Sequence, residues 1–466
     1  MSVTTDGREA LVERLNAEQP PHAHLRYLGT YPFGTRQIAR FSLANGLKLL
    51  LLRDPSAPVA SYHTWFGVGS RHEQPGKTGL AHLFEHLMFN ETKSLPAGEF
   101  DRTLEAAGGE VNAATWVDWT FYYENVPSSE LPLVVRLEAE RMQNLVLREP
   151  QVASEKEVVA NERRYRVEDD VEGAVNELLY KTAFTVHPYH WPTIGWMSDI
   201  EGFTTEDCET FYGTYYAPNN AIVAVVGDLD EGRLLAEVQR QYGAIAAAEL
   251  PPHRFEPEPK QERERRLEVE KPTPTEKLSL GFHAPALGDP DYAALSVLNE
   301  VLFGGKSSRL YRALISEGEL ATDVRGSLAP SKDPGLYEIW ASLREQRRAE
   351  EALSVVENVI DDVVNSGVTD AELEKAKNRL ELGFLHGMEN ASGKAEQLGF
   401  YETVLGDAGR IFKQLDAYRA VTSSEVRRVA AERLRSEART TILVRPKPDN
   451  DEPEADESDD GETEAA

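Results

Sequence analysis

The sequence predicts an α+β protein of two related domains, each with a sheet rich in antiparallel strands packed against helices. Three observations indicate this fold class. The 466 residues exceed what one hydrophobic core usually serves. Short strand patterns bounded by turns are interspersed with longer helical patterns in both halves of the chain. The second half also repeats features of the first half at a similar spacing.

The strands expected in the first half begin with a hairpin. Residues 36–43 and 47–52 flank Asn45-Gly46, a pair that favours a tight turn between antiparallel strands. Further strands are expected at 59–68, 110–116, 120–125 and 221–226. Helices are expected at 79–89, 97–107, 128–146, 149–182 and 205–216.

Composition divides the chain into five segments. Residues 1–30 are polar and are expected to form a flexible N-terminal segment, followed by a first domain at 31–245. Residues 246–262 carry four prolines among charges, which is typical of a linker. A second domain is expected at 263–447, and residues 448–466 form an acidic tail that we expect to be disordered.

Charge and cysteine content restrict the function classes. The formal net charge of −29 disfavours nucleic acid and anionic membranes as partners. It would favour basic peptides, although an ordinary solvated acidic surface is the preferred explanation of the charge. The single cysteine, Cys208, excludes intramolecular disulfides and a cysteine-based metal site. No apolar run reaches the roughly 20 residues that span a bilayer, and no signal sequence is seen, so a cytoplasmic location is expected by default.

The most informative stretch is the expected helix at 79–89, which contains His82, Glu85 and His86. Residues four apart on a helix lie one turn above each other, so both imidazoles share a face. Two neutral imidazoles can hold Zn²⁺, and a nearby carboxylate can take a proton from water, the chemistry of the H-x-x-E-H motif. The simpler alternative is a pair of surface or core histidines.

A third zinc ligand should come from another element. The expected helix at 149–182 offers Glu155 and Glu162, seven residues apart and therefore on one stripe. Taken alone, Glu162 could be a solvated charge on a helix rich in Glu and Arg. His187 and His190 are alternative ligands, although their proline-rich setting favours a structural role.

The internal repeat distinguishes between these possibilities. Residues 292–303 align with the expected helix at 79–89, with Phe303 on Phe89, and residues 371–379 align with residues 154–162. In this alignment the second copy replaces both histidines, the glutamate between them and Glu162 together, as expected if these residues serve one metal. The replacing residues are Ser296, Asn299, Glu300 and Arg379.

Together these motifs resemble the pitrilysin/insulysin/mitochondrial-processing-peptidase family of zinc metallopeptidases. The resemblance covers nearly residues 35–445 and is closest to zinc-bearing, β-subunit-like bacterial members with two domains. Besides the residues above, it rests on the following segments: Gly69-Ser70-Arg71, Gly108-Gly109, Asn112-Ala113, Glu155 to Arg163, Gly195 with Asp199-Ile200, Tyr215 to Asn220, Gly227-Asp228, and Gly304-Gly305 with Ser307 to Leu310.

The resemblance implies a LuxS/processing-peptidase-like metallohydrolase fold and a zinc endopeptidase acting on unfolded peptides, with one Zn²⁺ per chain. It makes His82, His86 and Glu162 the zinc ligands. Glu85 becomes the general base that activates zinc-bound water. Glu155 supports the site without binding metal, and Asn112-Ala113 matches the edge strand to which substrate backbone adds.

The chain departs from the family in its second domain. Active single-protein relatives carry an Arg and, seven residues later, a Tyr that bind or polarise the substrate carbonyl, whereas this chain has Ile315 and Thr322. Arg309 or Arg312 could compensate. We expect instead a homologous partner subunit that supplies the missing pair, or else a homodimer. A non-catalytic scaffold of the same fold is the alternative function.

Overall fold

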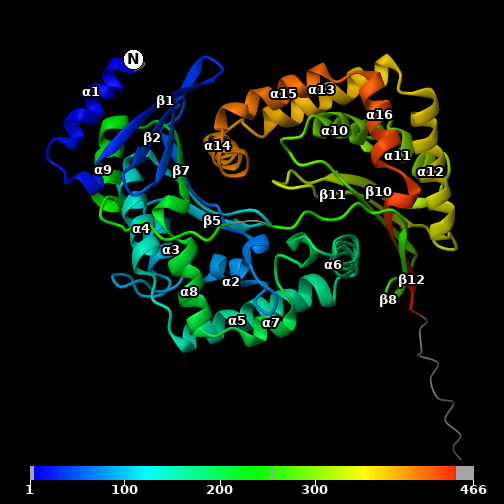
Figure 1. Cartoon of the computed structure of the whole chain (residues 1–466), viewed down its shortest axis with the longest axis horizontal. Helices are drawn as coiled ribbons and strands as arrows, with labels where there is room; N and C mark the ends of the chain where they lie inside the picture. The colour runs from blue at the N-terminus through cyan, green and yellow to red at the C-terminus, as the bar shows by residue number, and fades with distance from the viewer. Residues whose placement is uncertain (1–4, 253–254, 448–466) are drawn as a thin grey trace, which may run out of the picture.

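The computed structural model describes residues 5–252 and 255–447, and the expected acidic tail lies outside them. Figure 1 shows two halves, each a sheet with helices, arranged side by side. The strands of the first half are β1 Leu25–Phe33, β2 Arg36–Leu43, β3 Lys48–Arg53, β4 Val59–Phe66, β5 Glu110–Thr115, β6 Thr120–Pro127 and β7 Ala221–Gly227. Those of the second half are β8 Arg265–Lys271, β9 Lys277–His283, β10 Ala321–Leu328, β11 Leu336–Leu343 and β12 Arg439–Pro446.

The helices surround these sheets. In the first half they are α1 Thr5–Asn16, α2 Leu80–Leu87, α3 Glu99–Ala106, α4 Leu131–Asn144, α5 Glu149–Arg163, α6 Val171–Ala183, α7 Met197–Gly202, α8 Thr205–Tyr215 and α9 Glu231–Tyr242. In the second half they are α10 Pro290–Phe303, α11 Arg309–Tyr311, α12 Ala349–Ser366, α13 Asp370–His386, α14 Ala391–Leu405, α15 Ile411–Ala420 and α16 Ser423–Arg433.

The two sheets share one topology. The first has the order β1-β2-β3-β7-β4-β6-β5, and the second has the order β10-β11-β9-β12-β8. Read in the opposite direction, the second sheet matches the last five strands of the first. In each sheet the one parallel pair is at the same place, β3 with β7 and β8 with β12. The repeat seen in the sequence is therefore a repeat of α+β architecture.

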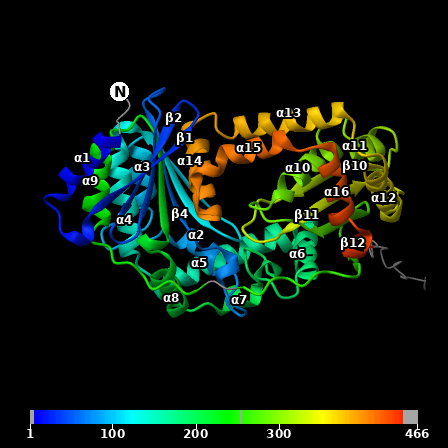
Figure 2. The ribbon, with the colours of Figure 1, turned by 45° about the horizontal axis from the view of Figure 1, so that its top comes forward.

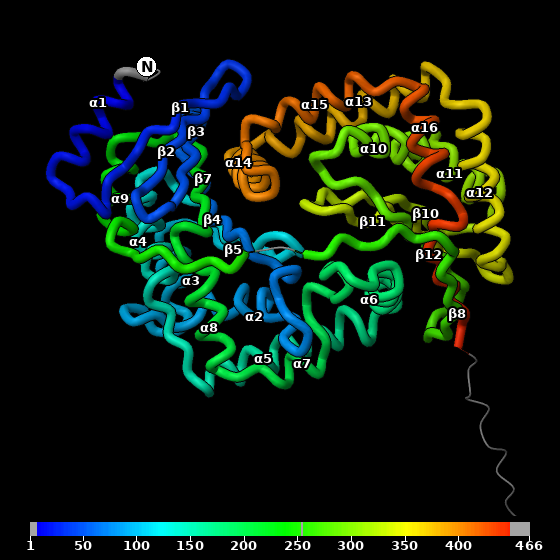
Figure 3. Tube along the Cα trace, viewed as in Figure 1, coloured from blue at the N-terminus to red at the C-terminus, as the bar shows by residue number. Residues whose placement is uncertain are grey.

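One helix of each half packs against the sheet of the other half. One face of the first sheet packs against helices of its own half, and its other face packs against α14 from the second half. The second sheet is covered in the same way, with α6 of the first half on the face opposite its own helices. Figures 1 and 3 show α14 beside the first sheet and α6 beneath the second.

This exchange explains the apolar run on β3. Side chains alternate between the two faces of a strand, so a strand covered on both faces reads as continuously hydrophobic. Leu49 and Leu51 belong to the core between the sheet and its own helices, whereas Leu50 and Leu52 belong to the cluster that contains α14.

Two expectations from the sequence are wrong. The N-terminal segment is not loosely attached, because residues 5–16 form α1 and Arg8 makes two hydrogen bonds, of 2.8 and 2.7 Å, to the carboxylate of Glu231 on α9. The helix expected at 149–182 is two helices. It breaks because a π-helical turn at Arg164–Glu168 follows α5 and Asp170 then caps a new helix, α6.

Candidate metal centre

The first ligand helix, α2, is positioned by contacts at its N-terminus. The buried carboxylate of Glu73 accepts hydrogen bonds from the backbone N–H groups of Gly79 (2.8 Å) and Ala81 (2.7 Å). These are groups that a helix start leaves without intrahelical partners. Asp199 accepts two more hydrogen bonds from Thr78, at 3.0 and 2.7 Å. The start of α2 is therefore held by the side chain of Glu73, which precedes the helix in the sequence, and by that of Asp199, which follows it.

Close backbone packing sets the distance between α2 and the loop before α7. Gly79 and Gly195 both have positive φ, at +96° and +86°, and a Cβ on Gly195 would lie 2.2 Å from the carbonyl oxygen of Thr78. Arg163, the last residue of α5, donates a hydrogen bond of 2.8 Å to the carbonyl of Gly195. The two ligand-bearing helices thus contact the same loop.

This packing brings three predicted ligands together. One donor atom each of His82, His86 and Glu162 lies within 4.8 Å of the other two. The Nε2 atoms of the histidines are 3.6 Å (His82) and 3.4 Å (His86) from Oε2 of Glu162. The imidazole rings are 5.0 Å apart between centroids. Residues 76 positions apart in the sequence therefore converge on one point from two helices.

The remaining predicted residues lie around this cluster. Oε2 of Glu155 is 3.7 Å from Nδ1 of His86, on the side away from Glu162's contact with Nε2. Asn112 and Ala113 are on β5, which is the last strand of its sheet and pairs only with β6 among the described strands. Figure 1 shows β5 next to α2.

Burial and neighbouring charges shift the pKa values of the ionisable groups in this cluster in different directions. Burial lowers the pKa of His82 to about 4, so its ring is neutral near pH 7. Burial also acts to lower the pKa of His86, but the neighbouring Glu162 outweighs it and the pKa is raised. Contact with His86 lowers the pKa of Glu162. Burial raises the pKa of Glu85, which suits a group that must accept and return a proton.

The alternative histidine ligands have other partners. Nε2 of His187 lies 3.1 Å from Oδ2 of Asp333 in the second half, and Nδ1 of His190 lies 2.7 Å from the carbonyl of Phe184. Arg71 pairs with the same Asp333 and with Asp118. His187 therefore belongs to a polar contact between the two halves.

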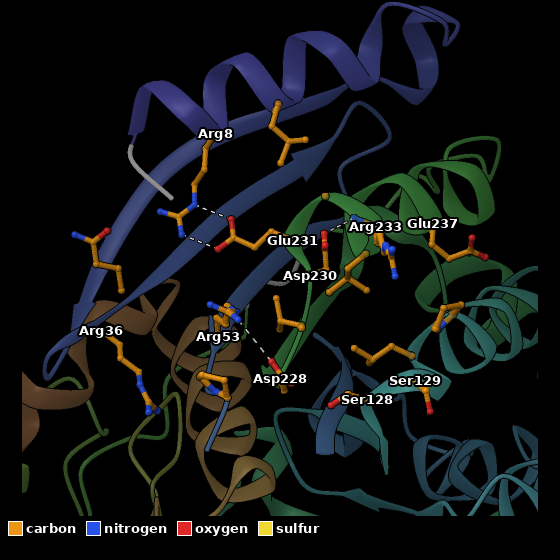
Figure 4. A pocket seen from close by; sticks show the side chains of 18 of the residues that line it. Arg8, Arg36, Arg53, Ser128, Ser129, Asp228, Asp230, Glu231, Arg233 and Glu237 are labelled. Atoms are coloured by element: carbon orange, nitrogen blue, oxygen red, sulfur yellow. Dashed lines mark hydrogen bonds and ion pairs between the residues drawn. The ribbon is translucent and has the colours of Figure 1, made fainter. Parts of the chain in front are cut away.

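A large cavity lies elsewhere. Its volume is about 810 Å³, and it is bounded by α1, the neighbourhood of β2 and β3, and the start of α9 (Figure 4). Two ion pairs lie within its lining, Arg8 with Glu231 at 2.7 Å and Arg53 with Asp228 at 3.8 Å. It shares no lining residue with the three-ligand cluster, so cavity size alone would not locate the metal centre.

Sequence reasoning did not identify Asn90, which donates a hydrogen bond of 3.2 Å to Oε1 of Glu155, or Arg166. Nε of Arg166 lies 3.0 Å from Oε1 of Glu162. The available signal was the i, i+4 spacing of opposite charges, but an arginine at that spacing on a charged helix is ordinary. Nothing in the sequence indicated the π-helical turn that carries it.

Comparisons with known proteins agree with this arrangement. Residues 48–195 match the family model described as Insulinase (Peptidase family M16), and residues 202–380 match the one described as Peptidase M16 inactive domain. The zinc protease PqqE of Helicobacter pylori is 32% identical over 87% of this chain and 92% of its own length.

Two further known proteins are also similar over most of this chain. An uncharacterized zinc protease of Mycobacterium tuberculosis, Rv2782c, is 32% identical over 84% of this chain and 89% of its own length. The crystal structure of a protease from Helicobacter pylori superposes with a TM-score of 0.84 at 31% identity, covering 87% of this chain and 99% of that one.

Proposed function

Because this chain belongs to peptidase family M16, whose two-domain fold it has, we propose that it is a zinc-dependent endopeptidase acting on unfolded peptides. The observation that carries the proposal is the convergence of His82, His86 and Glu162. Its relatives are named zinc proteases, which supports the metal and the reaction class.

The donor set fits zinc. Two imidazoles and one carboxylate are a recurrent ligand set of catalytic zinc sites, which leave a further position open. The neutral ring of His82 presents a lone pair, and the lowered pKa of Glu162 keeps its carboxylate ionised. Bound zinc would act as a Lewis acid that polarises a carbonyl and makes water more acidic.

Two residues of the chain would handle protons and orientation. Glu85 follows His82 by three positions on α2, and its raised pKa brings it nearer to the range of an effective general base. It would take a proton from the attacking water and return it to the leaving amine. Glu155, beside Nδ1 of His86, would hold that imidazole in one orientation.

Substrate backbone would bind along β5. A strand at the edge of a sheet has unpaired N–H and C=O groups that an extended peptide can use. Asn112 and Ala113 lie in the middle of this strand, which lies next to α2 (Figure 1). Selection would then depend on the ability of a peptide to extend, and the negative charge of the chain would favour basic segments.

We further propose that the active form needs a homologous partner, or a second copy of the chain. Ile315 packs against the core of the second half, and Thr322 lies on β10 and donates a hydrogen bond of 3.2 Å to the carbonyl of Ser342. Figure 2 shows β10 and α11 at the far end of the molecule from α2.

The arginines that could have compensated already have acidic partners in the second half. Arg309 pairs with Glu372 at 2.7 Å and with Asp362 at 2.9 Å, and Arg312 pairs with Glu317 at 2.5 Å. A cation and a phenol acting on the substrate would therefore come from another subunit.

Three measurements test these proposals. We expect about one zinc per purified chain, near-complete loss of zinc in H86A, and retained zinc with at least a 100-fold lower kcat in E85Q. Metal-free protein with an unchanged fold would contradict the enzyme and favour the scaffold alternative. Affinity purification of tagged chain from its source should recover a homologous subunit that raises peptide cleavage. Full activity of the isolated monomer would contradict the partner requirement.

The described residues include no helix that is both long enough and apolar enough to cross a membrane.

A further inference from the structure

The carboxylate of Glu162 has its two oxygens in different environments. Oε2 faces His82 and His86, whereas Oε1 lies 3.0 Å from Nε of Arg166. One oxygen is therefore engaged by a cation and the other is directed at the histidines. An ion pair of this kind fixes the rotation of a carboxylate that would otherwise present either oxygen.

The position of Arg166 depends on the irregular turn after α5. The π-helical turn Arg164–Glu168 directly follows the ligand helix, and such turns are frequent at functional sites. The backbone of the turn is packed tightly against α6, because a Cβ on Gly173 would lie 1.9 Å from the carbonyl oxygen of Arg166. Neighbouring structure therefore holds the turn in place.

The second half of the chain provides an internal comparison. There α13 carries Arg379 at the position of Glu162 and continues as a regular helix to His386, with Gly383 four residues after Arg379. After α13 the second copy thus has no π-helical turn corresponding to Arg164–Glu168, although one occurs elsewhere in that half at Arg312–Ser316, and no arginine at this spacing. Ligand and arginine are present together in one copy and absent together in the other.

Stability does not explain the arginine. The side chain of Arg166 is 68% exposed, and exposed ion pairs contribute at most about 1 kcal/mol to folding. Glu85, Glu155 and Glu162, by contrast, place three carboxylates around two histidines. A cation at this place offsets their mutual repulsion and orients the one that faces the histidines.

We propose that Arg166 is a positioning residue of the metal centre, which holds Oε1 of Glu162 so that Oε2 is presented to the metal together with His82 and His86. This inference rests on the proposed zinc site. Residues that hydrogen-bond to metal ligands typically contribute 10- to 100-fold to metal affinity, so the effect is measurable as zinc binding without any assay of peptide cleavage.

The test is a zinc titration of metal-depleted full-length protein against a fluorescent chelator. R166Q should weaken zinc binding about 10- to 100-fold, and R166K should recover part of the loss. The matched control is R164Q on the same turn, because Arg164 donates to Oδ1 of Asn161 (2.6 Å) and should leave zinc affinity unchanged. With Co²⁺ as the probe, R166Q should also change the visible absorption bands, which report the arrangement of the ligands.

The outcomes separate this inference from the proposed function. If the wild-type protein binds zinc and R166Q binds it with the same affinity, the positioning role is overturned while the zinc site stands. An equal loss in R164Q and R166Q would also overturn it, since the effect would belong to the turn as a whole. A wild-type protein that binds no zinc would overturn the proposed function and this inference with it. Melting of the zinc-free variants should match the wild type, which shows that the loss is not unfolding.

Discussion

The two halves differ in one pair of helices that they share. Helices α2 and α5 in the first half correspond to α10 and α13 in the second, but they carry different charged residues at the same positions. In the first copy, His86 and Glu162 face each other at 3.4 Å, and Arg166 pairs with the other oxygen of Glu162. In the second copy, Glu300 and Arg379 at the same positions form an ion pair of 2.6 Å. Where the first copy has the proposed metal site, the second copy has an internal ion pair. The difference teaches that the same two helix positions can hold either a histidine–carboxylate cluster suited to a metal or a self-contained ion pair.

The strongest test of this comparison is to give the first copy the charges of the second. The double variant H86E/E162R should reduce bound zinc from about one per chain to near zero, because one imidazole and the carboxylate ligand are lost. The new pair should form internally, so the melting temperature of metal-free protein should not fall. Metal content by mass spectrometry and thermal unfolding measure both effects. Retention of zinc would show that the ligands have been assigned incorrectly.

A second test concerns the packing that places α2 against α5. G195A should destabilise the protein by about 2–4 kcal/mol, because alanine is strained at φ +86° and its Cβ would meet the carbonyl of Thr78 at 2.2 Å. Zinc affinity should fall with it, since the ligand helices share this loop. G202A is the control, because nothing lies within 4 Å of a Cβ there. Equal unfolding of the two variants in urea would contradict the packing argument.

The helix starts of the two copies predict a difference in pH dependence. Exposed Asp289 caps α10 from the preceding position, whereas α2 is capped by the buried Glu73, whose pKa is raised to about 8 by burial. A carboxyl group with a raised pKa in the folded state contributes stability below its ordinary pKa and loses it as pH rises toward 8.

E73Q should therefore be less stable than wild type at pH 5, where one hydrogen-bond acceptor is lost, yet less sensitive to rising pH. The free energy of unfolding of E73Q should rise relative to that of the wild type by up to about 1.4 kcal/mol per pH unit between pH 5 and 8. Urea unfolding across this range measures it. Parallel stability curves for the two proteins would show that Glu73 does not titrate there.

The smallest effect is expected in the second copy. R379Q removes a partly exposed ion pair, with the two side chains 48% and 19% exposed, so it should lower stability by less than about 1 kcal/mol. Zinc content should not change. A measurable loss of zinc would mean that the second copy contributes to metal binding, so that the two copies would not have separate roles.

The convergence of His82, His86 and Glu162 could be predicted from sequence, because a metal-site motif depends on residue type and spacing. His82, Glu85 and His86 lie within one helical turn, and the simultaneous replacement of four positions in the second copy pointed to Glu162. Arg166 could not be found in the same way, because its contact depends on a π-helical turn that no pattern of hydrophobic residues reveals.

The fold shows the same division. The Asn-Gly hairpin and the main helices follow from local rules. From sequence, the apolar run at Leu49–Leu52 is expected only as one strand of that hairpin, and the structure shows it buried on both faces. The run does not say which segment covers the second face. That role belongs to α14, more than 300 residues later, and long-range packing of this kind has no local signal.

The exchange of α6 and α14 has a consequence for biosynthesis. The chain emerges from the ribosome in order, and domains generally fold as they are completed. Here, however, the first sheet keeps one hydrophobic face uncovered until residues 391–405 have been made. The half that carries His82, His86 and Glu162 is thus complete only after α14, late in the second half, has been made. In a chain truncated after residue 262, one face of the first sheet would lack α14. Helix α6 would lack the second sheet, against which it packs.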